Sequence, residues 1–460
     1  MTQASFSQLP LPAELLENLS SLDYQAMTPI QAASLPHILA GRDLIAKAKT
    51  GSGKTAAFGL GLLSKLNPSQ FQVQALVLCP TRELADQVGK ELRRLARQMQ
   101  NVKVLVLCGG TPLGPQLGSL EHGAHIIVGT PGRILEHLGK GSLKLDRLAC
   151  AVLDEADRML DMGFIDSIEE ILDHTPNSRQ TLLFSATYPV AIRQLSARFQ
   201  RDPMEVSVDQ SHAPNQIEQY FYEVDPARRD AALVGLLAHY RPESAVIFCN
   251  TKQDCRTVAE NLQNRGLHAL ALHGDLEQRD RDQVLVQFAN KSCSFLVATD
   301  VAARGLDIKE LPAVINFELP RDPEVYVHRV GRTGRAGQAG LALNLCTPAE
   351  IRRAQVIEDG QKAPLAWRSL DSLPDQPDLD LTPPMVTLCI AGGRKNKIRP
   401  GDILGALTQE AGLNRDQVGK IDISEFYAYV AVDRNLARRT CARLNEGKIK
   451  GRHFRVRTLR

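Results

Sequence analysis

The sequence predicts an α/β protein with two doubly wound parallel sheets in succession, followed by a small α+β domain. Short, nearly continuous apolar runs alternate with helix-like stretches in both halves of the chain. Strands of this kind are buried on both faces of a sheet that helices cover. The alternation stops between residues 203 and 214 and then resumes, which indicates a domain boundary.

The predicted elements follow this pattern along the chain. The first domain, 1–210, has predicted strands at 43–46, 75–79, 102–107, 125–128, 150–153 and 181–184. The second domain, 215–360, has predicted strands at 245–249, 269–272, 294–298, 314–317 and 341–345. A proline-rich linker is predicted over 361–384. The last domain, 385–460, is predicted as strand, helix, strand, strand, helix and strand over 386–391, 403–411, 418–423, 426–432, 436–444 and 454–458.

The composition is typical of a globular protein, with 43% hydrophobic and 23% charged residues, and no apolar run is long enough to span a bilayer. The N-terminus has neither the basic start nor the apolar block of a secretory signal. Nine scattered cysteines, none in a C-x-x-C pair, indicate buried free thiols in a reducing compartment. We therefore expect a cytoplasmic protein.

The charge is uneven along the chain. The net charge of the whole sequence is +3, but residues 385–460 hold 16 Lys and Arg against 7 Asp and Glu. The last domain is therefore a separate basic unit, and a polyanion is its expected partner.

A glycine-rich loop at 48–55 connects an apolar strand to a helix. Gly51 and Gly53 allow the backbone N–H groups to face a phosphate chain. Lys54 can reach the β- and γ-phosphates, and the Thr55 hydroxyl can ligate Mg²⁺. The alternative interpretation is an ordinary glycine-rich turn before a helix.

Two carboxylates, Asp154 and Glu155, follow the predicted strand at 150–153. Beside a phosphate loop, the first carboxylate can hold Mg²⁺, and the second can orient and deprotonate an attacking water. The alternative is a charged cap on a strand. The phosphate loop with Lys54 and Thr55 favours the catalytic interpretation.

The order of short motifs between residues 5 and 350 resembles the DEAD-box RNA helicases. Thr28 to Gln31, with Tyr24 ahead of it, is similar to the segment that binds adenine in this family, and Asp154 to Asp157 reads Asp-Glu-Ala-Asp. The resemblance implies two RecA-like domains, with Mg²⁺ held by Thr55 and Asp154, partly through water. The ATP contacts that it implies are Tyr24, Gln31, Ala48, Lys49, Thr50, Gly51, Ser52, Gly53, Lys54, Thr55 and Asp307.

The second predicted domain has no phosphate loop, so it can supply arginine fingers to a nucleotide held by its neighbour. The resemblance assigns this catalytic role to Arg332 and Arg335, beside Lys54, Asp154 and Glu155. It also implies a coupling set, namely Ser185, Thr187, His328 and Arg329, of which the last two would contact the Asp-Glu-Ala-Asp segment across the cleft. Such a split site is complete only when ATP and RNA bring the domains together.

Hydroxyls, arginines and glycine N–H groups after strand ends can bind a phosphodiester backbone without contacting the bases. The RNA contacts that the resemblance implies in the two domains are Pro80, Thr81, Arg82, Gly110, Thr130, Pro131, Gly132, Arg133, Thr299 and Asp300.

The basic last domain fits an RRM-like sheet. In the predicted strand 426–432, Phe426, Ala428 and Val430 face one way, and Tyr427 and Tyr429 face the other, where they are expected to be exposed for stacking on bases. A plain α+β domain with two surface tyrosines is the alternative. Because the first strand has no aromatic residue, a structured RNA bound by basic side chains is favoured. These side chains are Arg394, Lys395, Lys397, Arg452, Arg455 and Arg457.

A DEAD-box core with such a tail resembles the bacterial DbpA group. The resemblance implies an RNA-dependent ATPase and RNA helicase whose tail binds large-subunit (23S) ribosomal RNA during assembly of the 50S subunit, and the chain is expected to act as a monomer. The alternatives are a general RNA chaperone or RNP remodeller in RNA decay or cold response, a DNA translocase on the same core, and a non-enzymatic RNA chaperone.

Overall fold

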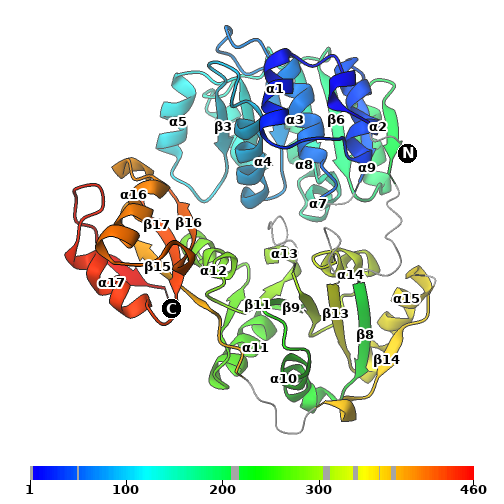
Figure 1. Cartoon of the computed structure of the whole chain (residues 1–460). Coiled ribbons are helices and arrows are strands. Elements are labelled where there is room, and N and C mark those ends of the chain that lie inside the picture. The colour runs from blue at the N-terminus through cyan, green and yellow to red at the C-terminus, as the bar shows by residue number, and fades with distance from the viewer. Residues whose placement is uncertain are drawn as a thin grey trace. The chain divides into compact units, whose positions relative to one another are not determined.

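The computed structural model of the chain describes residues 4–48, 51–208, 217–303, 311–334, 340–361, 363–373 and 380–459 (Figure 1). The chain divides into two compact units, with the division near residue 211. The first unit is one α/β domain, and the second contains another α/β domain and the small tail domain.

A seven-stranded parallel sheet with the order β3-β4-β2-β5-β6-β1-β7 forms the first domain. Its strands are β1 (Leu44–Lys47), β2 (Ala75–Leu78), β3 (Val104–Leu107), β4 (Ile126–Gly129), β5 (Cys150–Asp154), β6 (Gln180–Ser185) and β7 (Met204–Ser207). Its helices are α1 (Ala13–Ser21), α2 (Pro29–Leu39), α3 (Lys54–Ser64), α4 (Arg82–Leu95), α5 (Leu113–Glu121), α6 (Pro131–Gly139), α7 (Ala156–Asp161), α8 (Ile165–Asp173) and α9 (Val190–Phe199). Strands β5, β6 and β1 are neighbours, so the loops that follow them meet at one edge of the sheet, where ligands bind in such folds.

Alternate residues of each strand pack into separate cores on the two faces of this sheet. Leu44 and Val77 belong to the core that contains side chains of α1 to α4, whereas Ile45 and Leu76 belong to the core with α6 to α9. Burial on both faces explains why these strands are continuous apolar runs in the sequence.

The second α/β domain repeats this architecture, with a parallel sheet in the order β10-β11-β9-β12-β13-β8-β14. Its strands are β8 (Ile217–Glu223), β9 (Ala245–Cys249), β10 (Ala269–Leu272), β11 (Phe295–Thr299), β12 (Ala313–Asn316), β13 (Gly340–Cys346) and β14 (Ala366–Arg368). Its helices are α10 (Arg229–Tyr240), α11 (Lys252–Asn264), α12 (Gln278–Ala289), α13 (Asp300–Ala303), α14 (Pro323–Val330) and α15 (Ile351–Gln361).

Strand β14 lies inside the stretch that the sequence analysis assigns to a linker. It pairs with β8, and Trp367 stands opposite Phe221 with their ring centroids 5.5 Å apart. The predicted linker therefore contains the edge strand of the second sheet. A three-residue strand between prolines and polar residues carries too short a pattern to predict.

The tail forms an antiparallel sheet in the order β16-β17-β15-β18. Its elements are β15 (Met385–Ile390), α16 (Pro400–Gly405), β16 (Val418–Ile423), β17 (Ala428–Asp433), α17 (Ala437–Glu446) and β18 (Val456–Thr458). Leu388, Val430 and Val456 form one core with Ile403 of α16 and Leu444 of α17. The predicted order of the tail elements and the predicted fold class are confirmed. In the parallel sheets, β7, β8 and β14 were not predicted.

Candidate ATP and RNA sites

The phosphate loop joins β1 to α3 at the carboxyl edge of the first sheet. Gly51 and Gly53 have φ values of 84° and 96°, which side chains with a Cβ rarely adopt. A Cβ on Gly53 would also lie 2.6 Å from the Gln31 amide nitrogen. Lys54 is buried and donates to the Ala48 carbonyl at 3.0 Å. Lys49 and Thr50, two further predicted ATP contacts, lie outside the described residues.

Gln31 connects the predicted adenine-binding segment to this loop. Its amide nitrogen donates to the Gly53 carbonyl at 3.1 Å, and its amide oxygen accepts from the Thr28 N–H at 2.9 Å. Tyr24 is half-buried and donates to Glu91 of α4 at 2.8 Å. Burial, followed by this hydrogen bond, raises the pKa of Tyr24 to about 12. Gln31 therefore fixes the loop in addition to any contact with a base.

Asp154 ends β5, and Glu155 follows in a left-handed conformation with φ of 53°. Both are buried. Burial raises the pKa of Asp154, and the nearby Lys54 ammonium opposes that rise. The Glu155 carboxylate accepts from Arg158 at 2.8 Å, in a pair whose side chains are almost fully shielded from solvent. The second carboxylate is thus held in one orientation by a charge one helical turn away.

Asp157 is a candidate functional residue to which the sequence analysis assigns no role of its own. Its carboxylate accepts from the N–H groups of Ala186 and Thr187 at 3.0 and 2.9 Å, and from the Thr187 hydroxyl at 3.2 Å. Its own N–H donates to the Ser185 hydroxyl at 3.2 Å. The predicted coupling residues Ser185 and Thr187 are therefore hydrogen-bonded to Asp157 of the Asp-Glu-Ala-Asp segment. The available signal was the second Asp of Asp-Glu-Ala-Asp.

We expect Asp157→Asn to lower RNA unwinding more than ATP binding. The three loop contacts share Oδ2, and Oδ1 accepts from the Arg158 N–H at 3.0 Å. The amide must therefore place an N–H donor against one of these groups, and its uncharged oxygen accepts more weakly than the carboxylate, so the loop at Ser185 to Thr187 would be held less firmly. Each lost hydrogen bond to a charged group costs about 1.5–3 kcal/mol. Nucleotide affinity and duplex separation measured on the same preparation check this. Asp166→Asn, at an exposed position of α8, is the control, and equal effects of the two variants would contradict the anchor.

Arg133 and the loop at Gly110 are joined by Gln116 of α5. The Gln116 amide oxygen accepts from Arg133 and from His137, both at 2.9 Å, and its amide nitrogen donates to the Cys108 carbonyl at 3.1 Å. Arg133 also donates to the Thr111 carbonyl at 3.1 Å. Two predicted RNA-contacting segments that are distant in sequence thus form one surface, and Gln116, which sequence reasoning missed, holds it together.

The remaining predicted RNA contacts of the first domain lie at helix starts. Thr81 is buried, and its hydroxyl accepts from the Leu84 N–H at 3.3 Å to cap α4. Thr130 precedes α6, and Gly132 in its first turn is exposed with open space around it. Helix N-termini present N–H groups that suit phosphate oxygens.

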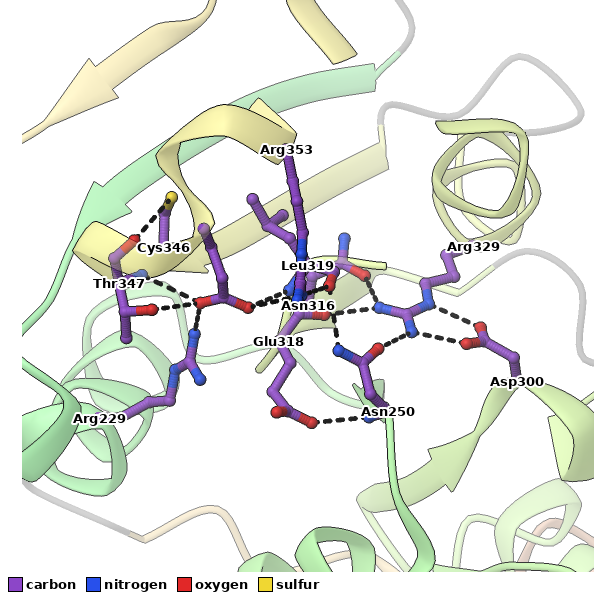
Figure 2. Close-up of polar contacts among 11 residues, drawn as sticks. Arg229, Asn250, Asp300, Asn316, Glu318, Leu319, Arg329, Cys346, Thr347 and Arg353 are labelled. Carbon is purple, nitrogen blue, oxygen red and sulfur yellow. Dashed lines mark hydrogen bonds and ion pairs between the residues drawn. The ribbon is translucent and has the colours of Figure 1, made fainter. Parts of the chain in front are cut away.

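In the second domain, Arg329 of α14 is a buried hub, 1% exposed in its side chain (Figure 2). It binds both carboxylate oxygens of Asp300 at 2.6 and 2.7 Å, and it donates to the Asn316 and Asn250 amide oxygens at 2.9 Å each. A fifth bond, at 2.7 Å, reaches the Glu318 carbonyl. A guanidinium has five N–H donors, so all are used inside this domain. The predicted contact of Arg329 across the cleft stays a prediction and would require breaking one of these bonds.

The hub joins the segments that follow β11, β9 and β12, where Asp300, Asn250 and Glu318 lie (Figure 2). Thr299, the other predicted RNA contact here, is 8% exposed at the end of β11. Arg332 is buried and His328 is half-buried. Asp307 and Arg335, predicted to contact ATP, lie outside the described residues.

The open face of the tail sheet packs on α12 within the second compact unit. Cys389, Tyr429 and Leu459 form an apolar cluster with Val286 of α12 and with Tyr427. Tyr429 is 5% exposed, and burial raises its pKa to about 12. The prediction of two exposed tyrosines is therefore wrong for Tyr429.

Polar contacts complete this interface. Thr387 Oγ1 accepts from the Asn290 amide at 3.2 Å, and Arg457 donates to Gln283 of α12 at 3.3 Å. The Arg279 guanidinium lies 5.3 Å from the centroid of the half-buried Tyr427 ring. Arg457, a predicted RNA contact, therefore binds the neighbouring domain here.

The exposed aromatic residue of the tail is Phe426, at 51% exposure, which the strand alternation placed in the core. Strand β17 starts at Ala428, so Phe426 lies in the preceding loop, where alternation does not apply. The Lys395 ammonium lies 4.3 Å from the centroid of this ring and pairs with Glu425 at 3.0 Å. Arg394, Lys397 and Arg455 are also exposed. We call Arg394, Lys395, Lys397, Phe426, Arg452 and Arg455 the loop surface.

The two parallel-sheet domains, with a phosphate loop and a buried carboxylate pair in the first, define a nucleotide-hydrolysing enzyme. Residues 28–195 match the DEAD/DEAH box helicase family, 228–337 the helicase conserved C-terminal domain, and 387–458 the DbpA RNA binding domain. The chain belongs to the DEAD-box family of ATP-dependent RNA helicases, as its motif order predicts.

Among its relatives, the ATP-dependent RNA helicase DbpA of Escherichia coli is 56% identical over 98% of both chains. CshA of Bacillus anthracis, a DEAD-box ATP-dependent RNA helicase, is 46% identical over 82% of this chain and 70% of its own length. Dbp5 of S. cerevisiae, bound to RNA and ADP BeF3, superposes with a TM-score of 0.72 at 30% identity, covering 80% of this chain and 96% of that one. In the described part of the chain, no helix has the length and hydropathy of a membrane span.

Proposed function

We propose that this helicase separates short RNA duplexes near a structured element of 23S ribosomal RNA, to which its tail directs it during assembly of the 50S subunit. It acts in the cytoplasm and as a monomer. The loop surface is the observation that carries this proposal, because it gathers basic side chains and one exposed aromatic ring on a domain whose sheet face is covered.

ATP hydrolysis in this proposal uses the buried groups at the carboxyl edge of the first sheet. Lys54 exchanges its carbonyl partner for phosphate oxygens, which form stronger, charge-assisted bonds. Glu155 orients the attacking water and accepts its proton, and Arg158 fixes the direction of that carboxylate. Asp157 couples structural changes at the hydrolysis site to the loop at Ser185 to Thr187, because it is hydrogen-bonded to that loop.

The same edge fits Mg²⁺. One carboxylate oxygen of Asp154 and the Ser52 hydroxyl are buried without a hydrogen-bond partner among the described residues. Oxygen ligands from one or two side chains, supplemented by phosphates and water, are what this ion prefers. Asp154 and Thr55 would hold it. When bound, it neutralises charge on the β- and γ-phosphates.

The tail reads RNA mainly through phosphates and the shape of a folded element. Its sheet face is occupied by α12, so stacking of bases along β15 and β17 is excluded in this arrangement. Phe426 can stack on one unpaired base, and the surrounding basic groups suit backbone phosphates.

Reversing two charges of the loop surface tests this assignment. We expect Arg394→Glu with Arg455→Glu to weaken binding of a folded 23S ribosomal RNA fragment about tenfold or more and to flatten the dependence of affinity on salt, because fewer counterions are released. Binding measured at two salt concentrations, with random RNA of equal length alongside, checks this.

Arg438→Glu with Arg439→Glu is the matched control, since both arginines are exposed on α17 and the pair carries the same charge change. The proposal fails if the control and the loop variant lose equal affinity, or if intact protein binds random RNA as well as the ribosomal fragment. A preference that is absent from the start would favour a general RNA remodeller.

A further inference from the structure

A cavity of about 280 Å³ lies at the outer edge of the second sheet, apart from the ATP and RNA sites. Strands β8 and β14 form its floor, and α15 forms its wall. The residues that line it are Glu223, Ile351, Gln355, Glu358, Leu365 and Trp367. None of them takes part in the chemistry described above.

Trp367 presents an indole ring to this cavity. Its side chain is on the same face as its strand partner Phe221, whose buried ring supports it from below. Trp367 nevertheless remains 43% exposed. A large aromatic ring that is fixed on one side and open on the other is typical of binding surfaces.

Two carboxylates stand beside this ring. Glu358 is held in place because one of its oxygens accepts from the Leu365 N–H at 3.1 Å. Glu223 projects from β8 on the same face of the sheet as Phe221. Within the described ranges, no lysine or arginine forms an ion pair with either carboxylate. An open indole and two carboxylates that have no cationic partner among the described residues are complementary to a guanidinium or ammonium group.

The backbone beside the cavity is also open. Strand β14 ends the sheet, and β8 is its one neighbour among the described strands. An added strand can therefore hydrogen-bond along its outer side, and alternate side chains of that strand would face the cavity. Arg368 points to the other face, where its guanidinium lies 3.4 Å from the centroid of the Tyr220 ring, so it does not compete for the carboxylates.

We propose that this groove, formed by the cavity and the outer edge of β14, binds an extended basic peptide of a protein partner. One arginine or lysine of the peptide lies over Trp367 between Glu223 and Glu358, and its backbone pairs with β14. The carboxylates repel phosphate, so RNA is not the occupant. The site extends the function of the helicase to a protein contact and does not depend on the ribosomal target.

Trp367 is the only tryptophan of the chain and therefore reports binding directly. The full chain is titrated with an acetylated, amidated octapeptide in which arginine alternates with serine, and tryptophan emission is followed. We expect a saturable change that becomes weaker at high salt. The same peptide with citrulline in place of arginine keeps the shape without the charge, and we expect it to bind at least about threefold more weakly, within the range of exposed charge contacts.

Variants separate this site from general attraction between opposite charges. Glu358→Gln is expected to weaken peptide binding about two- to fivefold, and Glu223→Gln to act in the same direction. Glu260 is an exposed carboxylate on α11 near the opposite edge of the sheet, and Glu260→Gln is expected to leave peptide affinity unchanged. ATPase activity of all three variants should equal that of the parent protein.

Three results would overturn the proposal. Equal binding of the arginine and citrulline peptides would remove the charge argument. An equal loss of peptide affinity in Glu260→Gln and Glu358→Gln would mean that the peptide binds through unspecific charge attraction. Free arginine amide that binds as tightly as the peptide would assign the groove to a small cationic ligand and not to a peptide.

Discussion

Replacing Glu155 with glutamine is expected to slow RNA-stimulated ATP hydrolysis about a hundredfold or more, the usual contribution of a positioned general base. Binding of ATP and RNA should persist, because the Lys54 ammonium and the loop glycines are unchanged. Glutamine keeps an oxygen that can accept from Arg158, so the fold should survive. Single-turnover hydrolysis and nucleotide affinity, measured together, test this.

Two variants control this result. Glu170→Gln, an exposed carboxylate on α8, should leave hydrolysis unchanged. Lys54→Ala should act earlier, by weakening ATP binding itself. Turnover near the parent rate in Glu155→Gln would show that another group prepares the water.

Replacing Arg329 with methionine is expected to destabilise the second domain by about 3–5 kcal/mol, the cost of breaking a buried ion pair by removing one partner. The Asp300 carboxylate and the Asn250 and Asn316 amide oxygens would all lose their donor. Urea unfolding of the full chain, followed by the emission of Trp367 in the same domain, measures the loss.

Arg352→Met, on an exposed position of α15, is the control and should change the free energy of unfolding by less than about 0.5 kcal/mol. Arg329→Lys should recover only part of the loss, because one ammonium cannot reach acceptors in three separate segments. Full recovery by lysine would mean that charge alone, and not the branched geometry of Figure 2, stabilises the domain.

The sheets were predictable because their physical signal is local. A strand buried on both faces must be apolar throughout, so runs such as 75–79 and 245–249 stand out, and the observed β2 and β9 lie within them. The phosphate loop is also local, since Gly53 and Lys54 act within one turn of the chain. The phosphate loop, which lies within one short segment, could therefore be predicted from the sequence.

The missed features depend on contacts between distant segments. The sequence order cannot show that Asp157 accepts from the loop at Thr187, or that Gln116 joins Arg133 to Cys108. Tyr429 was misplaced for the same reason, because alternation along a strand distinguishes two faces and cannot tell which of them another domain covers. Phe426 was misplaced because the strand begins two residues later than predicted.

The covered sheet face limits how this tail can be exchanged between helicases. A tail grafted onto another core would carry Tyr429, Cys389 and Leu459 uncovered unless the recipient offers an equivalent of Val286 and Asn290. A chimera that receives the whole tail domain would therefore expose an apolar surface prone to aggregation, in addition to gaining the RNA target of the tail. Swapping only the residues around Phe426 leaves the interface intact, so under the proposed role of the loop surface RNA specificity is transferable in loops and not in domains.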